Sequence, residues 1–227
     1  MPTNEGQQRH ARFLPLTQMV NLALLSAIAY VVMVFGRIPV VLFLKYDPKD
    51  VIIVIAGLIY GPFSSFMVSL VVSFVEMVTV SDTGWIGFAM NLLSTCCFAC
   101  PAAYLYKKKQ SLVGAIIGLV IGGLLTVAVM LLWNYLLTPI FMNMDRAIIV
   151  PMLWSAFLPF NLLKVTLNAA LTMLIYKPVV GALRKANLIP PSTAALPKAK
   201  RNLGVILVSA CVLLTCILYL MASNGVF

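Results

Sequence analysis

Apolar residues form runs of about twenty along most of the chain, a length with which a helix crosses the ~30 Å hydrocarbon core of a bilayer. Short polar segments separate these runs. The pattern therefore predicts an all-α membrane protein with six or seven transmembrane helices. We expect the helices at residues 16–35, 51–60, 63–80, 85–106, 112–137, within 151–176, and at 203–222.

Glycine and proline mark the predicted ends of several helices. Gly61 and Pro62 divide the long apolar run 51–80 into a short helix and a longer one, because this pair favours a turn. The segment 138–150, in which polar residues interrupt apolar ones, is predicted to be a loop. Pro159 is expected to break the sixth helix near its start, since proline removes a backbone hydrogen bond.

The composition excludes an ordinary soluble protein. Hydrophobic residues make up 62% of the chain and charged residues 10%, with a mean hydropathy of +1.04, whereas soluble domains are roughly half apolar and a quarter charged. A net charge of +10 would suggest a nucleic-acid partner in a soluble protein. Here the basic residues lie in short connections between apolar runs, so we expect a lipid bilayer and no nucleic acid around the chain.

The positions of Lys and Arg predict the orientation, because these residues accumulate on the cytoplasmic side. With the N-terminus inside, the cytoplasmic segments hold eleven of them: Arg9, Arg12, Lys107, Lys108, Lys109, Lys177, Arg184, Lys185, Lys198, Lys200 and Arg201. The outer segments hold four, Arg37, Lys45, Lys49 and Arg146, together with Asp47, Asp50, Asp82 and Asp145. This predicts a multi-pass protein of the cell membrane with a cytoplasmic N-terminus.

The chain is expected to divide into four parts: a cytoplasmic tail (1–15), a six-helix membrane domain (16–177), a basic cytoplasmic linker (178–202) and a seventh helix (203–223). Arg9, Arg12 and the Ala27-Ile28-Ala29 triplet also resemble a secretory signal with its cleavage site. The apolar run continues to Phe35, which favours a first helix that is retained.

Two charged side chains, Glu76 and Lys164, are left inside apolar runs. A charge at the bilayer centre costs ~2.5–3.5 kcal/mol, so such residues usually face a cavity or another charge and mark a site. Both lie near the outer ends of their predicted helices. We therefore expect a site in the outer half of the bundle, although a structural ion pair or a lysine that extends to the interface is the simpler alternative.

Polar residues recur at helical spacing around both charges. One series comprises Ser65, Ser69, Ser73 and Glu76, and the other Asn161, Lys164, Asn168 and Thr172. Spacings of three and four residues put each series on one helical face. In lipid such faces are expected to point inward, toward a cavity or toward helix–helix hydrogen bonds. Asn91 and Asn134 are expected to complete a ring of donors and acceptors.

Two series of small residues predict close helix packing. Gly114, Gly118 and Gly122 form a GxxxGxxxG series on the fifth helix, and such faces let helices approach closely. Ala23 and Ala27 form a smaller AxxxA face on the first helix, which fits either internal packing or a partner protein.

Motifs of common enzymes are absent from the sequence. It has no GxxxxGK[ST] phosphate loop, HExxH or GxSxG, and its one histidine, His10, precedes the first helix. Cys97 and Cys100 form a CxxC pair without a second pair or a nearby histidine, which argues against a metal site. We expect no enzymatic activity, catalytic residue, metal or cofactor, and an ATP-driven process would need its motor on another chain.

Several segments together resemble the riboflavin-specific S component of energy-coupling factor (ECF) transporters. In order, they are Leu44–Asp50, Gly61-Pro62, Glu76, Asn91–Thr95, Leu132–Tyr135 and Phe157–Lys164. The resemblance extends over residues 16–187 and depends on both the motifs and their spacing. The predicted seventh span departs from it, because the usual S component ends after six helices.

The resemblance implies a six-helix subunit that binds riboflavin from outside and joins a transmembrane T component and two ATPases for uptake. It implies that residues 16–177 form the substrate-binding domain and that Ala23 and Ala27 dock the T component. The expected ligand residues are Leu44, Lys45, Tyr46, Asp47, Glu76, Thr79, Asn91, Asn134, Asn161 and Lys164, of which the resemblance implies Leu44–Asp47, Asn161 and Lys164. Lys164 would donate to a flavin acceptor, and Glu76 would accept from hydroxyls or hold Lys164.

Three other readings stay open from the residues alone. The chain could be an S component for another vitamin or precursor, since the polarity and depth of the site do not identify the ring system of the ligand. It could be a membrane enzyme in which Glu76 and Lys164 act as an acid–base pair. It could also be a proton-coupled carrier that works without ATPases.

Overall fold

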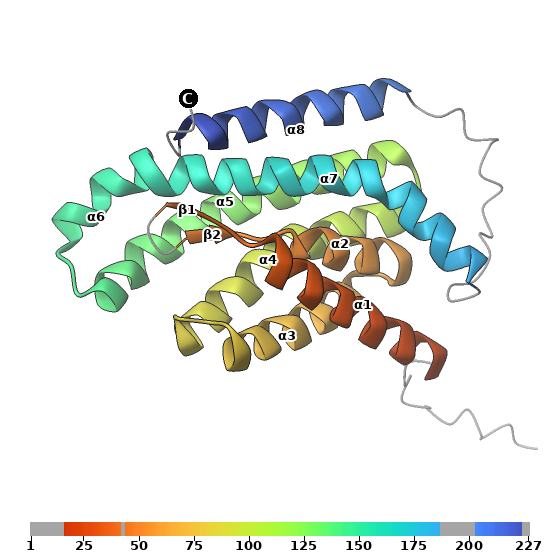
Figure 1. The fold of residues 1–227 in the computed structure, drawn as a ribbon, viewed down its shortest axis with the longest axis horizontal. Helices are drawn as coiled ribbons and strands as arrows, with labels where there is room; N and C mark the ends of the chain where they lie inside the picture. The colour runs from red at the N-terminus through yellow and green to blue at the C-terminus, as the bar shows by residue number, and fades with distance from the viewer. Residues whose placement is uncertain (1–15, 42–43, 187–202, 224–227) are drawn as a thin grey trace, which may run out of the picture.

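The computed structural model describes residues 16–41, 44–186 and 203–223. The predicted tail (1–15) and most of the predicted linker (187–202) lie outside these residues. The elements are α1 (Leu16–Gly36), β1 (Ile38–Val41), β2 (Leu44–Tyr46), α2 (Lys49–Tyr60), α3 (Pro62–Thr79), α4 (Gly84–Lys109), α5 (Leu112–Met142), α6 (Arg146–Met152), the π-helical turn η1 (Leu153–Phe157), α7 (Leu158–Lys185) and α8 (Leu203–Ser223) (Figure 1).

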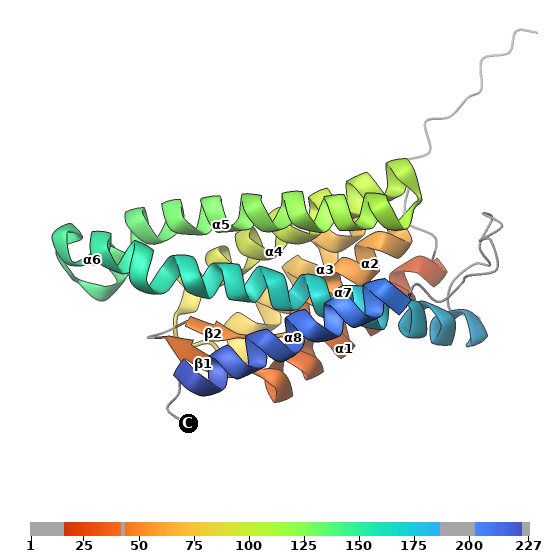
Figure 2. The same ribbon diagram turned by 90° about the horizontal axis from the view of Figure 1, so that it is seen from above.

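The all-α membrane class is confirmed, because the long helices lie side by side in one bundle (Figure 1). Among the described residues, five helical segments are long and apolar enough to cross a membrane: Leu16–Gly36, Pro62–Thr79, Gly84–Lys109, Leu112–Met142 and Arg146–Leu183. The crossing of α8 stays a prediction. Figures 1 and 2 show α8 running along α7 at the edge of the bundle.

The short helix α2 lies at the centre of the bundle, in contact with α1, α3, α4 and α7. Its residues from Lys49 to Leu58 are all buried. A helix that is apolar on every side is typically buried on every side, and α2 reads VIIVIAGL after its first two residues. Gly61 (φ 106°) and Pro62 then form the predicted turn into α3.

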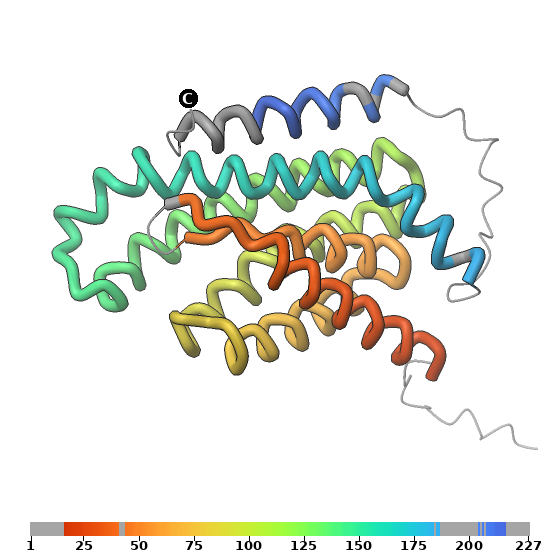
Figure 3. The backbone as a smooth tube through the Cα atoms, viewed as in Figure 1, coloured from red at the N-terminus to blue at the C-terminus, as the bar shows by residue number. Residues whose placement is uncertain are grey.

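A two-stranded hairpin covers the end of the bundle at which α1 ends and α7 begins (Figure 3). Its strands β1 and β2 pair antiparallel, with Ile38 opposite Tyr46 and Pro39 opposite Lys45. Successive side chains of a strand point to opposite sides, so Leu44 and Tyr46 are buried while Lys45 is partly exposed. The segment was expected to be a loop, and the hairpin is what brings its side chains over the helices.

Two predictions about helix ends are wrong. The segment 138–150 is largely helical, because α5 continues through Pro139 to Met142 and α6 begins at Arg146. Pro159 does not break the sixth span, which is helical from α6 through α7. The π-helical turn Leu153–Phe157 ends two residues before Pro159, and its altered hydrogen-bond pattern lets the helix continue through a residue that has no N–H.

The predicted close packing through the GxxxGxxxG series is confirmed between α4 and α5. A Cβ atom built on Gly118 would lie 2.8 Å from the Cα atom of Ala102, and one on Gly122 would lie 2.4 Å from the carbonyl oxygen of Phe98. Both neighbours are backbone atoms of α4, which cannot turn away as a side chain can. These glycines therefore set the distance between the two helices.

Gly122→Ala is expected to destabilise the protein, whereas Gly181→Ala is expected to stabilise it slightly. The first change forces α4 and α5 apart, a kind of overpacking that costs about 1–3 kcal/mol. At Gly181, on α7, a Cβ atom meets nothing within 4 Å, so alanine brings only its better helix propensity of about 1 kcal/mol. Thermal denaturation in detergent measures both, and equal effects would contradict the glycine contact.

Candidate functional site

Six charged side chains gather where the hairpin meets α2, α3 and α7, of which five are buried and one, Arg37, is partly buried. We call them the ion cluster: Arg37, Asp47, Lys49, Asp50, Glu76 and Lys164. Three are cations and three are carboxylates, so their formal charges cancel. This balance matters because an unpaired charge in a dry interior is far more costly than a paired one.

Glu76 is the centre of the first half of the ion cluster. Its carboxylate forms ion pairs with Arg37, at the end of α1, and with Lys49, at the start of α2. Asn91 on α4 donates a further hydrogen bond to it over 3.1 Å. Asp47 lies 3.9 Å from the Arg37 guanidinium and 3.8 Å from the Lys49 ammonium. Glu76, on α3, thus links the end of α1, the start of α2 and α4.

Asp50 is the centre of the second half. It accepts from the Thr95 hydroxyl over 2.6 Å and from the Asn168 amide over 3.1 Å. The Lys164 ammonium lies 3.3 Å from the same carboxylate and 3.5 Å from the Ser94 hydroxyl. The lysine expected from the sequence is therefore buried and paired with a residue of α2.

Two sequence-based expectations are corrected by these contacts. Lys49 and Asp50 were assigned to an aqueous outer loop, but they are 0% and 1% exposed. Glu76 was expected to accept from ligand hydroxyls or to hold Lys164. It pairs with Arg37 and Lys49 and does not hold Lys164, and its role toward ligand hydroxyls stays a prediction. The reason is that α2 begins at Lys49 and lies in the core, so its first residues enter the interior with it.

The hairpin residues occupy three different environments. Leu44 packs in an apolar cluster with Phe157 and Phe160 at the start of α7. Tyr46 is buried, and its hydroxyl donates to Asn168 over 3.0 Å. Lys45 points outward and pairs with Asp82 at 2.6 Å, so it is not part of the buried site.

The surroundings of Asp47 and Asp82 shift the pKa values of these two aspartates in opposite directions. Burial raises the pKa of Asp47, although the nearby charges of Lys49 and Lys164 oppose the rise. The hydrogen bond from Lys45, and then its positive charge, hold the pKa of exposed Asp82 below its ordinary value.

Three of the expected ligand residues make other local contacts. Asn134 on α5 and Asn161 on α7 are buried, and each amide donates to a carbonyl of its own helix over 2.7 Å. Thr79 is exposed at the end of α3, where its hydroxyl accepts from Tyr30. Asn134 also lines a pocket with Met90 and Trp133 that measures about 10 Å³, room for about one water molecule.

The inward direction of the two polar series is confirmed. Ser65, Ser69, Ser73 and Glu76 are each at most 3% exposed, and Asn161, Lys164, Asn168 and Thr172 at most 6%. In contrast, Ala23 and Ala27 on α1 are exposed. Within the described bundle the AxxxA face is therefore open to the surroundings and does not pack against another helix.

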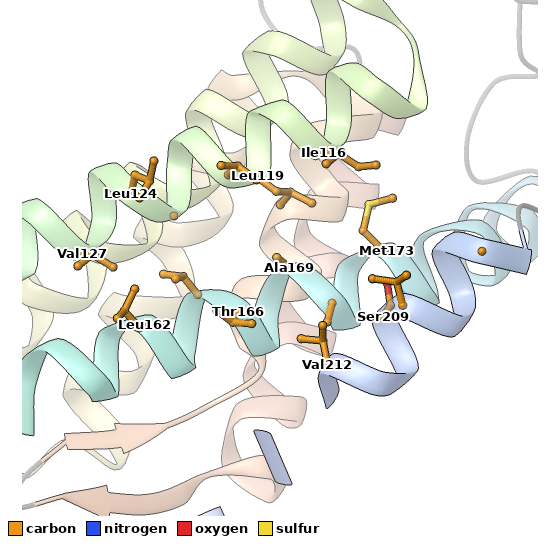
Figure 4. A pocket seen from close by; sticks show the side chains of 16 residues that line it. Ile116, Leu119, Leu124, Val127, Leu162, Thr166, Ala169, Met173, Ser209 and Val212 are labelled. Carbon is orange, nitrogen blue, oxygen red and sulfur yellow. The ribbon is translucent and has the colours of Figure 1, made fainter. Parts of the chain in front are cut away.

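A larger groove of about 530 Å³ lies between α5, α7 and α8 (Figure 4). Among its described lining residues, Thr166 and Ser209 supply the polar side chains, and the others are apolar or glycine. Such a lining suits hydrocarbon, and it has no charged group to orient a polar ligand. The ion cluster is therefore the better candidate for a site with polar specificity.

Sequence reasoning missed four contributors to the site: Arg37, Lys49, Asp50 and Thr95. The available signal was the unbroken apolar run 51–58, which is typical of a fully buried helix. Reading Lys49 and Asp50 as the first turn of that helix would have placed both in the interior. The signal for Arg37 is weaker, because only the fold brings it to Glu76.

Comparisons with known proteins agree on a transport family. A family model described as "ECF transporter, substrate-specific component" matches residues 17–176. The riboflavin transporter RibU of Streptococcus thermophilus is 29% identical, over 74% of this chain and 85% of that protein. The riboflavin transporter FmnP of Bacillus subtilis is 27% identical over 75% and 97%.

A solved structure supports the fold as well. It is titled "Structure and mechanism of the S component of a bacterial ECF transporter" and superimposes with a TM-score of 0.64. The two chains are 26% identical, and the match covers 74% of this chain and 97% of the other. The relatives are named transporters and not enzymes, in agreement with the expectation that the chain has no enzymatic activity.

Glu76→Gln is expected to lower the free energy of unfolding by about 3–5 kcal/mol, because it leaves buried cations without their carboxylate. Asp82→Asn is the matched control, since it removes a carboxylate from an exposed pair, and exposed pairs contribute little. Denaturant unfolding of the purified protein measures the difference. A Glu76→Gln variant as stable as the control would mean that the ion cluster does not hold the helix ends.

Proposed function

Because the chain belongs to the family of substrate-specific components of ECF transporters, we propose that it captures riboflavin at the outer surface of the cell membrane for uptake. The named riboflavin transporters support the identity of the ligand, since two of them share 29% and 27% of their residues with this chain over most of their length. The ion cluster supports the location of the site, beneath the hairpin and between α3, α4 and α7.

The observation that carries this proposal is the combination of buried charge and apolar surface at one end of the bundle. A flavin has a flat ring with carbonyl acceptors and a chain of hydroxyls. Apolar residues of the hairpin and of α7, such as Leu44 and Phe160, suit the ring, and Lys164 suits a carbonyl acceptor. Pockets with mostly apolar walls and a few polar groups are typical of such ligands.

Two buried polar atoms, one in the ion cluster and one on α3, have hydrogen-bonding capacity left for the hydroxyls of the ligand. Asp47 Oδ1 and Ser73 Oγ are buried without a hydrogen-bond partner. Buried polar atoms normally have one, and a hydroxylated chain offers both donors and acceptors. Asp47 follows β2 directly, so a ligand bound to it would contact the hairpin.

We expect this end of the bundle to open for a flavin, because the charged side chains of the ion cluster are paired with one another and little exposed. The hairpin is the element that can move without separating two long helices, although Tyr46 must then leave its hydrogen bond to Asn168 and its packing with Leu163 and Leu167. We therefore expect the hairpin to lift, admit the ligand and close over it.

For uptake, the chain would join a transmembrane T component and two ATPases, with its N-terminus in the cytoplasm. The exposed Ala23 and Ala27 on α1 supply a face of small residues, against which a helix of the T component can pack closely. The predominance of Lys and Arg in the connections at the opposite end from the hairpin supports this orientation.

Purified protein in detergent is expected to quench riboflavin fluorescence, and Lys164→Ala and Asn161→Ala are expected to weaken binding. Loss of the charged donor Lys164 should raise Kd about tenfold or more, because hydrogen bonds to charged groups contribute about 1.5–3 kcal/mol. Loss of the neutral amide of Asn161 should have a smaller effect.

Lys177→Ala is the matched control for these variants, since it removes an exposed lysine from the same helix. It should bind riboflavin as the unchanged protein does. Absence of quenching by the unchanged protein would favour a component for another vitamin. Normal affinity in both Lys164→Ala and Asn161→Ala would remove these two residues from the site.

Ala23→Trp is expected to leave riboflavin binding intact and to abolish ATP-driven uptake, because the indole would fill the face that docks the T component. Ile121→Trp places the same side chain at an exposed position of α5 and should preserve both properties. Binding is measured by fluorescence titration and uptake with labelled riboflavin in cells. Uptake at the normal rate by Ala23→Trp would exclude α1 as the docking helix.

A further inference from the structure

Asp50 is a buried carboxylate to which the sequence assigned no role. Its side chain accepts from α4 and α7 at once: Thr95 donates to Oδ1, and both Asn168 and Lys164 lie against Oδ2. It also occupies the first turn of α2, where the helix dipole favours an anion. Asp50 is therefore well stabilised as a charged group although it is 1% exposed.

Lys164 and Asn168 reach Asp50 from one face of α7, because they are four residues apart. The Asn168 amide donates to the carboxylate, so its oxygen faces the other way and accepts from the Tyr46 hydroxyl over 3.0 Å. One carboxylate thus determines the position of the Lys164 ammonium and, through Asn168, the position of strand β2.

We propose that Asp50 is the positioning residue of the ligand site, which aims the Lys164 ammonium at the ligand and holds the hairpin closed through Asn168 and Tyr46. This inference rests on the proposed function only in so far as Lys164 contacts riboflavin. The link between Asp50 and the hairpin stands on the contacts of the chain itself.

Asparagine at position 50 would disrupt both roles while keeping the size of the side chain. Three donors converge on the two oxygens of Asp50, and an amide would replace one oxygen by a further donor. The Lys164 ammonium would lose its counter-charge, and either Thr95 or Asn168 would face an N–H group. Lys164 and Asn168 would then adopt other positions, and β2 would lose its anchor.

The first test is a double-mutant cycle in riboflavin titrations with Asp50→Asn, Lys164→Met and the variant that carries both. Each single change should raise Kd about tenfold or more. If Asp50 acts in part through Lys164, the double variant should lose less affinity than the product of the two single losses, and the remaining loss beyond Lys164→Met is that of the hairpin link. Normal affinity in Asp50→Asn, or losses that multiply in the double variant, would overturn the proposal.

The second test uses ligand-free protein and does not depend on riboflavin. Hydrogen exchange at residues 44–48 should accelerate about tenfold in Asp50→Asn, since local opening becomes easier, and exchange in α5 should be unchanged. Asp145→Asn makes the same chemical change at an exposed position. It should alter hydrogen exchange neither at residues 44–48 nor in α5. Unchanged exchange at residues 44–48, or an equal increase throughout the bundle, would overturn the proposed role in the hairpin.

The two tests separate the proposals from each other. Failure of the unchanged protein to bind riboflavin would refute the proposed ligand, and the exchange experiment would still decide whether Asp50 controls the hairpin. Riboflavin binding with normal affinity in Asp50→Asn would support the ligand and refute the role of Asp50.

Discussion

The mutual neutralisation of six charges, five of them buried, is the constraint on which the hairpin end of this bundle depends. Each carboxylate and each cation loses its hydration when the helices pack, and only a partner of opposite sign offsets that loss. The partners come from the ends of α1, α2, α3 and α7 and from the hairpin. None of these helices can be displaced without exposing or isolating a charge.

Such contacts matter more in a membrane than in water. Lipid chains are as apolar as the faces of the helices, so burying leucine against leucine gives little preference for one arrangement over another. Close backbone contact and polar pairing supply that preference. The bundle uses the first between α4 and α5, at Gly118 and Gly122, and the second around α2, where Glu76 and Asp50 each join several helices.

The sequence predicted the helices well because their signal is local, whereas the contacts of the site are not local. Run length and the Gly61-Pro62 pair located α1 to α5 to within a few residues, except that α5 continues beyond Pro139. Helical spacing also identified Lys164 as an inward-facing residue. Its partner could not be found in this way, because Asp50 is adjacent in sequence to a polar segment and reaches the interior only through the packing of α2.

The helix α8 is an addition to the family region that packs beside the candidate site. The family match ends at residue 176, and α8 begins at Leu203 and packs along α7. Figure 1 shows it at the edge of the bundle opposite α3, whereas the AxxxA face belongs to α1, which contacts α2 and α3. Because α8 lies along α7, it leaves the face with Ala23 and Ala27 exposed on α1. It also reaches the hairpin, since Leu213 and Cys216 pack against the cluster that contains Tyr46, so a movement of the hairpin would have to break this contact with α8 as well.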